Sequence, residues 1–422
     1  MTHGLGRLPG KRPIGGRYLL CLLWLGCATP SAGEPLGEGQ AVQLGLARPG
    51  VEDVLAGTVA LAESEAAAAA MHPNPVAAYG REQTFGGADA SAEDYAWLLQ
   101  KFDLSGRRGL RAEAAQRRVE ARQDEVRGRR QALGAAIRLR FYEVLLGQQR
   151  CAALRQWSAR LATAAERVGR RAAAGDAASY DRQRAEREHA AARARLAIDE
   201  AALARARARL AAVIGDGAAP ADAPAVDGAL LPAAPLPSLD ATLAQVPSRP
   251  DLRALEASAA AADLQGRASA RWWLPEIEIG AGYKGVDVGN ERLDGFIANG
   301  AVPLPLFDRD QDEAQRAAAE ARIARGQWQV ELAEAAGELR GLHGQAATLT
   351  DAARAARSAG DRDWRALTRS AEAAYQGGET GILELVDAYR AELDAELQTL
   401  DLEWRARRAR IELDRLTGAE VE

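Results

Sequence analysis

Lysine, methionine, cysteine and aromatic residues are all scarce in this chain of 422 residues. Three of its 54 basic residues are lysines, it has two methionines and three cysteines, and aromatic residues make up 5% of it. So few aromatic side chains cannot fill the core of a large globular domain. The frequent residues are instead alanine, leucine, arginine and glutamate, which are typical of long helices.

The sequence also lacks metal-ligand and catalytic motifs. Its four histidines are far apart, and none has the spacing of a ligand set. No phosphate-binding loop, nucleophile elbow or pair of catalytic acids occurs. We therefore expect no enzymatic activity, no cofactor and no resident metal ion, so that any energy must come from a partner protein.

Residues 1–32 have the pattern of a secretory signal peptide. Four basic residues and no acidic residue precede the apolar run YLLCLLWLGCA. Small and turn-forming residues follow it in TPSAGEP. The run is too short to anchor a chain across a bilayer, and a buried N-terminal helix is the alternative. Because its surroundings resemble a lipoprotein cleavage site, Cys27 is a candidate for lipidation.

Export would leave an acidic chain with a single cysteine. Removing the four basic residues of the signal from a formal charge of −5 gives −9. Such a chain lacks the basic surface that nucleic acids require, so we expect no nucleic-acid partner. Only Cys151 lies beyond the signal, which excludes an intramolecular disulfide.

Four landmarks recur after about 200 residues and indicate a tandem duplication. The motif ARPGVEDVLA returns as SRPDLRALEA, PNPVAAYG as WLPEIEIGAGY, and FDLSGRRGLRAEAA as LPLFDRDQDEAQRAAA, while Gly175 is matched by Gly378. We divide the chain into a first repeat, a Pro/Ala-rich linker, a second repeat and a C-terminal tail, at residues 33–214, 215–247, 248–417 and 418–422.

Each repeat predicts the same order of elements. A helix of about 25 residues ends near a proline, two strands follow, and a very long helix leads through a glycine break into a helix of about 35 residues. The expected helices cover 48–72, 106–172 and 180–214, then 250–272, 309–376 and 382–417; the expected strands cover 75–86, 93–104, 275–288 and 293–304. Apolar residues alternate from Ile277 to Tyr283, as in a strand with one apolar face, and shift register beyond Gly285, which predicts a bulge. Heptad seams along the helices, such as Leu154, Trp157, Leu161, Ala164 and Val168, predict coiled-coil packing.

The lengths of these elements indicate an assembly. A helix of 67 residues is roughly 100 Å long, and the two shorter helices of a repeat together match it if they stack end to end. The strands have the length of tilted bilayer-spanning strands. Four strands cannot close a barrel, and an open edge is not tolerated in lipid. We therefore expect a mainly α fold with a small β part, in which three chains share a twelve-stranded barrel; a soluble four-stranded sheet is the alternative.

The motifs SRPDLRALEA, WLPEIEIGAGY, VPLPLFDRD and YQGGETGILELVDAYRAELD resemble the TolC-like outer membrane efflux proteins, closest to the heavy-metal and multidrug branch that works with RND-type pumps. The resemblance covers the whole chain beyond the signal. It implies a homotrimer with a barrel in the lipid of the outer membrane and a large periplasmic α-helical tunnel. It also implies docking on a periplasmic adaptor (membrane fusion) protein, which couples the tunnel to an inner-membrane pump.

The resemblance further implies roles for residues at the two glycine breaks. The breaks become the hairpin turns at the periplasmic tip, where the adaptor docks and the pore narrows. The tip residues are Gly175, Ser179, Gly378 and Thr380; the pore constriction is formed by Glu384 and Asp387; the closed-state latch is a hydrogen bond between Asp181 and Tyr375. Thr380 stands where the family sometimes has an arginine, and ordinary acids on an exposed helix face are the alternative for the constriction.

The predicted function is a passive exit duct for metal cations or small toxic compounds. A type I secretion duct has the same architecture and stays open. A periplasmic adaptor or a coiled-coil scaffold is a third class, but an adaptor has one hairpin between β-rich segments, and a scaffold does not explain the proline-bounded strand pairs.

Overall fold

The computed structural model describes residues 35–86, 91–175, 178–215, 225–274, 276–360 and 364–418. Residues 35–422 form one compact unit. The predicted signal peptide with Cys27 and nearly all of the C-terminal tail lie outside the described residues.

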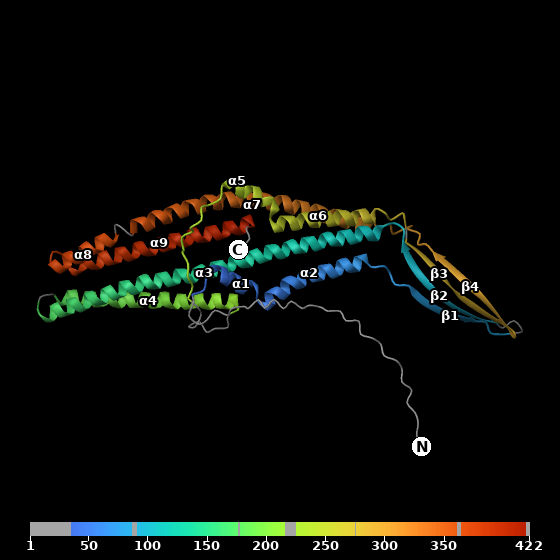
Figure 1. Ribbon diagram of the computed structural model, residues 1–422, viewed down its shortest axis with the longest axis horizontal. Coiled ribbons are helices and arrows are strands. Elements are labelled where there is room, and N and C mark those ends of the chain that lie inside the picture. Colours follow the sequence, from blue (N-terminus) through green and yellow to red (C-terminus); the bar gives the residue numbers. More distant parts are fainter. Residues whose placement is uncertain are drawn as a thin grey trace, which may run out of the picture. The chain divides into compact units, whose positions relative to one another are not determined.

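The element order repeats, as the sequence predicted (Figure 1). The first half contains α1 (Glu38–Leu46), α2 (Pro49–Ala70), β1 (Val76–Gln83), β2 (Ser91–Asp103), α3 (Arg107–Ala173) and α4 (Ser179–Ile214). The second half contains α5 (Leu239–Gln245), a 3-10 turn (Val246–Ser248), α6 (Pro250–Ser269), β3 (Glu276–Val288), β4 (Glu291–Ala301), α7 (Gln311–Ala359), α8 (Arg365–Gly377) and α9 (Ile382–Thr417). The fold is therefore mainly α with four strands.

Proline and glycine residues set the ends of these helices. Pro49 and Pro250 stand in the first turns of α2 and α6, where a missing N–H costs nothing. Gly175 and Gly378 follow α3 and α8 with φ of 85° and 75°, a left-handed conformation that favours glycine. Each of these two glycines begins the turn into the next long helix, as the sequence predicted.

The prediction of one continuous helix over 309–376 is wrong. α7 ends at Ala359 and α8 begins at Arg365, and both Gly360 and Trp364 are π-helical. A π-helical turn adds a residue to the helical repeat and interrupts the i→i−4 ladder. α3, with 67 residues, has no such interruption. The region predicted as a linker also contains a helix, α5, which is capped by the Ser238 side chain.

Short helices stack end to end beside the long ones, as the lengths predicted. Arg48, just before α2, donates a hydrogen bond of 3.2 Å to the carbonyl of Val213 near the end of α4. In the second half, Gly418 at the end of α9 lies beside Pro250 at the start of α6. α2 and α4 thus line up along α3, and α6 and α9 line up along α7 (Figure 1).

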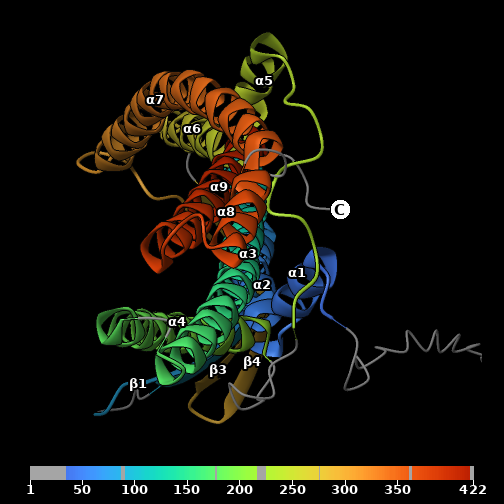
Figure 2. The same ribbon diagram turned by 90° about the vertical axis from the view of Figure 1, so that its left-hand side faces the viewer.

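The helices α4, α3, α9 and α7 follow one another in an arc, with α1 and the inter-repeat segment on its convex side (Figure 2). Apolar seams join them. The predicted seam of α3 is confirmed, because Leu154, Trp157, Leu161, Ala164 and Val168 are all buried. Leu385, Leu393 and Leu400 of α9 belong to the same core. Within the described ranges, no helix has the length and hydropathy needed to cross a membrane.

The four strands form one antiparallel sheet in the order β1-β2-β3-β4. β3 pairs with β2 from Glu276 to Val288 in one unbroken register, so the bulge predicted at Gly285 is wrong. The apolar residues Val286 and Val288 instead occupy the face of the sheet that carries Lys284, because alternation continues to the end of the strand.

Substituting the two neighbouring glycines of the second turn separates backbone geometry from side-chain volume. Gly378→Ala forces a Cβ into the left-handed region and is expected to lower the free energy of unfolding by about 1–2 kcal/mol. Gly377→Ala is the matched control, since Gly377 is the last residue of α8 and has no positive φ. Thermal unfolding of both purified variants in detergent measures the difference. Equal melting temperatures would contradict the geometric role of Gly378.

Candidate functional site

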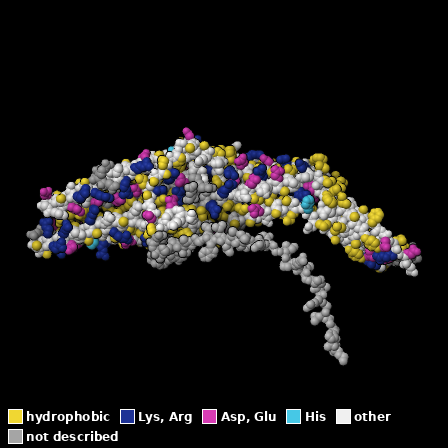
Figure 3. All heavy atoms as spheres, viewed as in Figure 1, with side chains coloured by type: hydrophobic (Ala, Val, Ile, Leu, Met, Phe, Trp, Pro, Cys, Tyr) yellow, Lys and Arg dark blue, Asp and Glu magenta, His cyan; other side chains and the backbone are white. Residues whose placement is uncertain are grey.

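One face of the sheet is mainly apolar and exposed, and its charged residues lie near the strand turns, at Arg81, Asp94, Asp287, Arg292 and Asp294. Strand alternation and the pairing register place on this face Tyr79, Leu98, Phe102, Ile277, Ile279, Ala281, Tyr283 and Phe296. Six of them are prominently exposed, with Phe296 at 87% and Tyr79 at 68%. Figure 3 shows hydrophobic side chains gathered over the strands, at the right of the view. Exposure of this many large apolar side chains on one surface is typical of contact with lipid or another protein.

The opposite face is more polar. It carries the charged residues Glu82, Glu93, Lys101, Glu278 and Lys284, together with Tyr95 and Trp97. Lys284 pairs with Glu93 at 2.7 Å and Lys101 lies 4.0 Å from Glu278, so both lysines lie across the sheet from acids. Exposed large apolar residues occur on this face only toward strand ends, at Val76, Val288 and Leu293. The sheet therefore has the two unlike faces of a barrel wall.

Both outer strands of the sheet have a free edge in the described part of the chain. β1 pairs only with β2, and β4 pairs only with β3. The backbone N–H and C=O groups along each free edge are available to a further strand.

The far end of the helices carries the predicted constriction. Glu384 and Asp387 share one exposed face of α9, while Leu385 and Val386 between them are buried in the core. The Asp387 side chain is 72% exposed and makes a loose ion pair of 3.8 Å with Arg390 on the same helix. Glu384 lies in the first turn of α9, where the helix dipole favours a negative charge. The structure thus leaves both carboxylates free to face a pore, and their ring remains a prediction.

The predicted latch residues do not bond within one chain. Among the described residues, no hydrogen bond joins Asp181 to Tyr375. Tyr375 is buried, and the guanidinium of Arg171 lies 6.0 Å from the centre of its ring. Ser179 begins α4 and is exposed, whereas the hydroxyl of Thr380 is buried and has no hydrogen-bond partner in the described part of the chain. The latch and the docking role of these turns stay predictions.

The contacts that join the two hairpins are not predictable from the sequence. Arg390 of α9 pairs with Glu188 of α4 at 2.6 Å, and Arg160 of α3 pairs with Glu392 of α9 at 2.6 Å. Tyr389 donates a hydrogen bond of 2.8 Å to Glu372 of α8; burial, with help from that carboxylate, raises the pKa of Tyr389. Nothing in the sequence marks these residues, because every helix carries similar charges and only the packing selects the partners.

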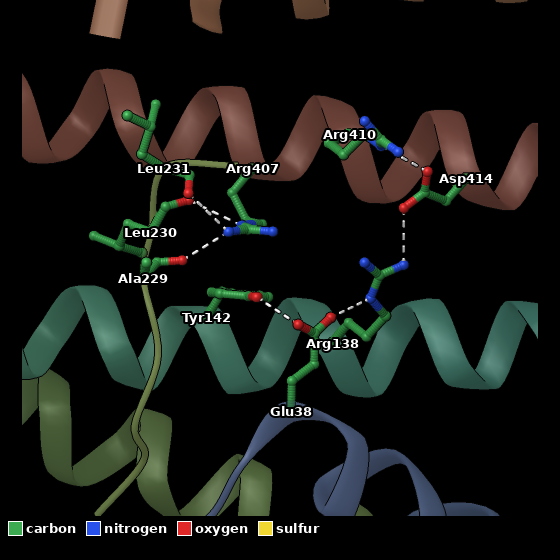
Figure 4. A network of polar contacts seen from close by, with 9 residues as sticks. All are labelled: Glu38, Arg138, Tyr142, Ala229, Leu230, Leu231, Arg407, Arg410 and Asp414. Carbon is green, nitrogen blue, oxygen red and sulfur yellow. Dashed lines mark hydrogen bonds and ion pairs between the residues drawn. The ribbon is translucent and has the colours of Figure 1, made fainter. Parts of the chain in front are cut away.

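A second polar network ties the middle of the molecule together (Figure 4). Glu38 of α1 accepts hydrogen bonds from Arg138 and Tyr142 of α3. Arg138 also reaches Asp414 of α9 at 3.1 Å, and Asp414 in turn pairs with Arg410 at 2.8 Å. Although burial opposes the charge of Arg138, the carboxylates of Glu38 and Asp414 raise its pKa. Burial, with help from Glu38, raises the pKa of Tyr142.

Arg407 extends this network to the segment between the repeats. It donates hydrogen bonds to the carbonyls of Ala229, Leu230 and Leu231 at 2.7–3.0 Å, and its guanidinium lies 4.5 Å from the centre of the Tyr142 ring. Burial lowers the pKa of Arg407. The network therefore joins α1, α3, α9 and the inter-repeat segment at one level of the molecule (Figure 4).

The described residues contain no group of three or more His, Cys, Asp or Glu side chains placed to hold a metal ion. What they do contain is a sheet with one apolar exposed face and two free edges, joined to two long helical hairpins. These features together are those of a membrane channel. In such a channel the strands lie in the lipid and the helices extend away from the membrane.

Comparison with known proteins supports this class of channel. Residues 246–419 match the family model described as outer membrane efflux protein. The chain is 27% identical to a cobalt-zinc-cadmium resistance protein of Cupriavidus metallidurans over 75% of each chain. It is 29% identical to a nickel-cobalt-cadmium resistance protein of Alcaligenes xylosoxydans xylosoxydans, over 54% of this chain and 51% of that one.

The fold comparison agrees. A crystal structure of a membrane protein from Pseudomonas aeruginosa superposes with a TM-score of 0.75 at 19% identity, covering 90% of this chain and 92% of that one. The predicted resemblance to the outer membrane efflux proteins is thereby confirmed. The protein is an outer membrane efflux channel, and its family and fold are those of channel proteins rather than enzymes.

Removal of Glu38 tests whether the central network stabilises the fold. Glu38→Ala leaves the Tyr142 hydroxyl without its acceptor and Arg138, whose side chain is 11% exposed, with one carboxylate fewer. We expect the free energy of unfolding to fall by about 1–3 kcal/mol, the cost of an unsatisfied buried polar group. Glu63→Ala, on an exposed position of α2, is the control and should change it by less than about 0.5 kcal/mol. Denaturant unfolding in detergent compares them, and equal losses would refute the stabilising role.

Proposed function

We propose that three copies of this chain close one twelve-stranded barrel in the outer membrane, which a tunnel of their helices continues into the periplasm. The observation that carries this proposal is the exposed apolar face of a sheet whose two outer strands, β1 and β4, have free edges. In lipid, each unpaired backbone group costs several kcal/mol, so the edges must find partners.

The direction of the strands supports closure by identical copies. All three pairings within the sheet are antiparallel, so β1 and β4 run in opposite directions. β4 of one copy can therefore pair with β1 of the next in the same antiparallel sense. Three sheets of four strands give 3 × 4 = 12, an even number in the size range of bacterial outer-membrane barrels.

The proposed channel is the passive exit of a three-part export system. An inner-membrane RND-type pump would supply the energy, and a periplasmic adaptor protein would join the pump to the tip formed by the turns at Gly175 and Gly378. Metal cations are the proposed cargo. Support comes from the two relatives, which are named for resistance to cobalt, zinc and cadmium and to nickel, cobalt and cadmium.

The oligomeric state in detergent tests the proposal. We expect the mature protein to need detergent for solubility and to have about three times the mass of one chain in its protein component, because only closure satisfies the edges of β1 and β4. Multi-angle light scattering with a separate detergent signal measures this mass. A stable monomer in plain buffer would overturn the barrel and the exit duct together.

The acids at the start of α9 are proposed to line the narrowest part of the duct. Three copies of Glu384 and Asp387 would place 3 × 2 = 6 carboxylates around the axis, and such rings favour cations. The neutral double variant Glu384→Gln/Asp387→Asn is expected to lose most of the preference for potassium over chloride in single-channel recordings.

A charge-matched control uses the first hairpin. Glu166→Gln/Glu186→Gln removes two acids from exposed positions of α3 and α4, and we expect it to leave the ion preference unchanged. If the two double variants behave alike, the constriction is not formed by Glu384 and Asp387.

A further inference from the structure

The polar face of the sheet, which faces the lumen in the proposed trimer, carries its two bulkiest side chains on β2. The register aligns Ala78, Trp97, Gly282 and Ile297 across the four strands at one level. At the next level toward the strand turns, it aligns Gly80, Tyr95, Lys284 and Gly295. Each aromatic residue of β2 therefore has a small residue beside it on β1.

Trp97 lies along the wall and is directed across β1. The position that a Cβ would take on Gly80 is 3.5 Å from Cη2 and 3.8 Å from Cζ3 of the Trp97 ring. Gly80 is not opposite Trp97 but diagonal to it, so the indole leans over β1 to reach it. A Cβ at these distances would be in ordinary van der Waals contact with the ring, so only a longer side chain, such as leucine, would displace the indole.

Tyr95 braces this arrangement from the side. Its ring meets Trp97 edge to face, with centres 6.0 Å apart and planes at 74°. The Tyr95 hydroxyl donates a hydrogen bond to Glu93, and Lys284 lies 5.1 Å from the centre of the Tyr95 ring while pairing with Glu93. Trp97 is therefore held between a fixed tyrosine and the glycine of the neighbouring strand.

The orientation of Trp97 matters because of the barrel's size. An eight-stranded barrel is filled by its side chains, whereas barrels of 16–18 strands leave an open channel. Twelve strands lie between these limits, so the bore depends on whether large side chains lie along the wall or project from it. We propose that Trp97, folded against Gly80, sets the bore of the outer part of the duct and thereby the largest solute that can leave.

This inference rests on the proposed trimer and on the lumen assignment of the polar face. It adds a size filter that is separate from the carboxylates at the far end of the helices. Gly80→Leu should push the three indole rings off the wall and narrow the bore. Adding Trp97→Ala to that variant should remove the obstruction.

Cysteine accessibility from outside the cell tests the bore without depending on the periplasmic tip. The inner reporter, Asn299→Cys, lies on the lumen face one level further from the strand turns than Trp97, whereas the outer reporter, Val286→Cys, lies on the same face nearer the turns. Intact cells are treated with a small maleimide and with maleimides on polymers of increasing size. The chain without an added cysteine gives the background.

We expect Gly80→Leu to slow the reaction of the inner reporter with the large reagents several-fold. The reaction of the inner reporter with the small reagent and all reactions of the outer reporter should stay unchanged. Gly80→Leu/Trp97→Ala should restore the rate with the large reagents, and Trp97→Ala alone should raise it. Ala77→Leu is the control, because it adds the same side chain to the outward face of β1.

The outcomes separate this inference from the proposed function. Unchanged rates in Gly80→Leu, or no recovery with Trp97→Ala, overturn the role of Trp97 and leave the barrel intact. If neither reporter reacts with even the small reagent, the polar face does not line an open lumen, and both proposals fall. If the leucine variant does not assemble, Trp97→Ala alone decides, since it must admit larger reagents to the inner reporter.

Discussion

The backbone groups along the free edges of β1 and β4 impose the strongest constraint on this protein. Water can satisfy them while the chain is outside the membrane, but lipid cannot. The same sheet exposes large apolar side chains on one face, which water does not favour. A single copy is therefore unsatisfied in both environments, and only a closed barrel places the apolar face in lipid and pairs every edge. The length of the helices and the position of the turns matter to function only once this closure has occurred.

Two kinds of contact hold the helices together: one extends along their whole length, and the other acts at particular positions. Apolar seams run along α3, α4 and α9 and give continuous packing. Polar contacts then fix particular levels, such as the pairing of Arg390 with Glu188 near the turns and the network around Glu38 in the middle (Figure 4). Arginine suits these contacts because its planar guanidinium can bind two acceptors at once. Arg357 shows this, with two hydrogen bonds of 2.8 and 2.9 Å to the buried Glu403 and a third to Glu396.

The two ends of the proposed duct select by different physical properties. At the helix turns, Glu384 and Asp387 would act through charge, which depends on ionic strength and on the ions present. In the barrel, Trp97 and Gly80 would act through volume, which does not. The central network lies between these ends and joins both repeats to the helix α1. It therefore holds the two hairpins together at one position along their length. In the proposed duct, entry and exit would thus be controlled by different parts of the chain.

The duplication, the order of the elements and most of their boundaries can be predicted from the amino-acid sequence, because proline, left-handed glycine and apolar periodicity act over a few residues. The limits of α9 and the buried seam of α3 follow from such local signals. The motifs and their order in the sequence also indicate the resemblance to the outer membrane efflux proteins. The separation of α7 from α8, the unbroken register at Gly285 and the partners of the charged residues depend on how the elements pack, and they emerge only from the three-dimensional structure. Arg390 and Glu188 are 202 residues apart, and neither charge carries information about which of many opposite charges the packing brings within reach.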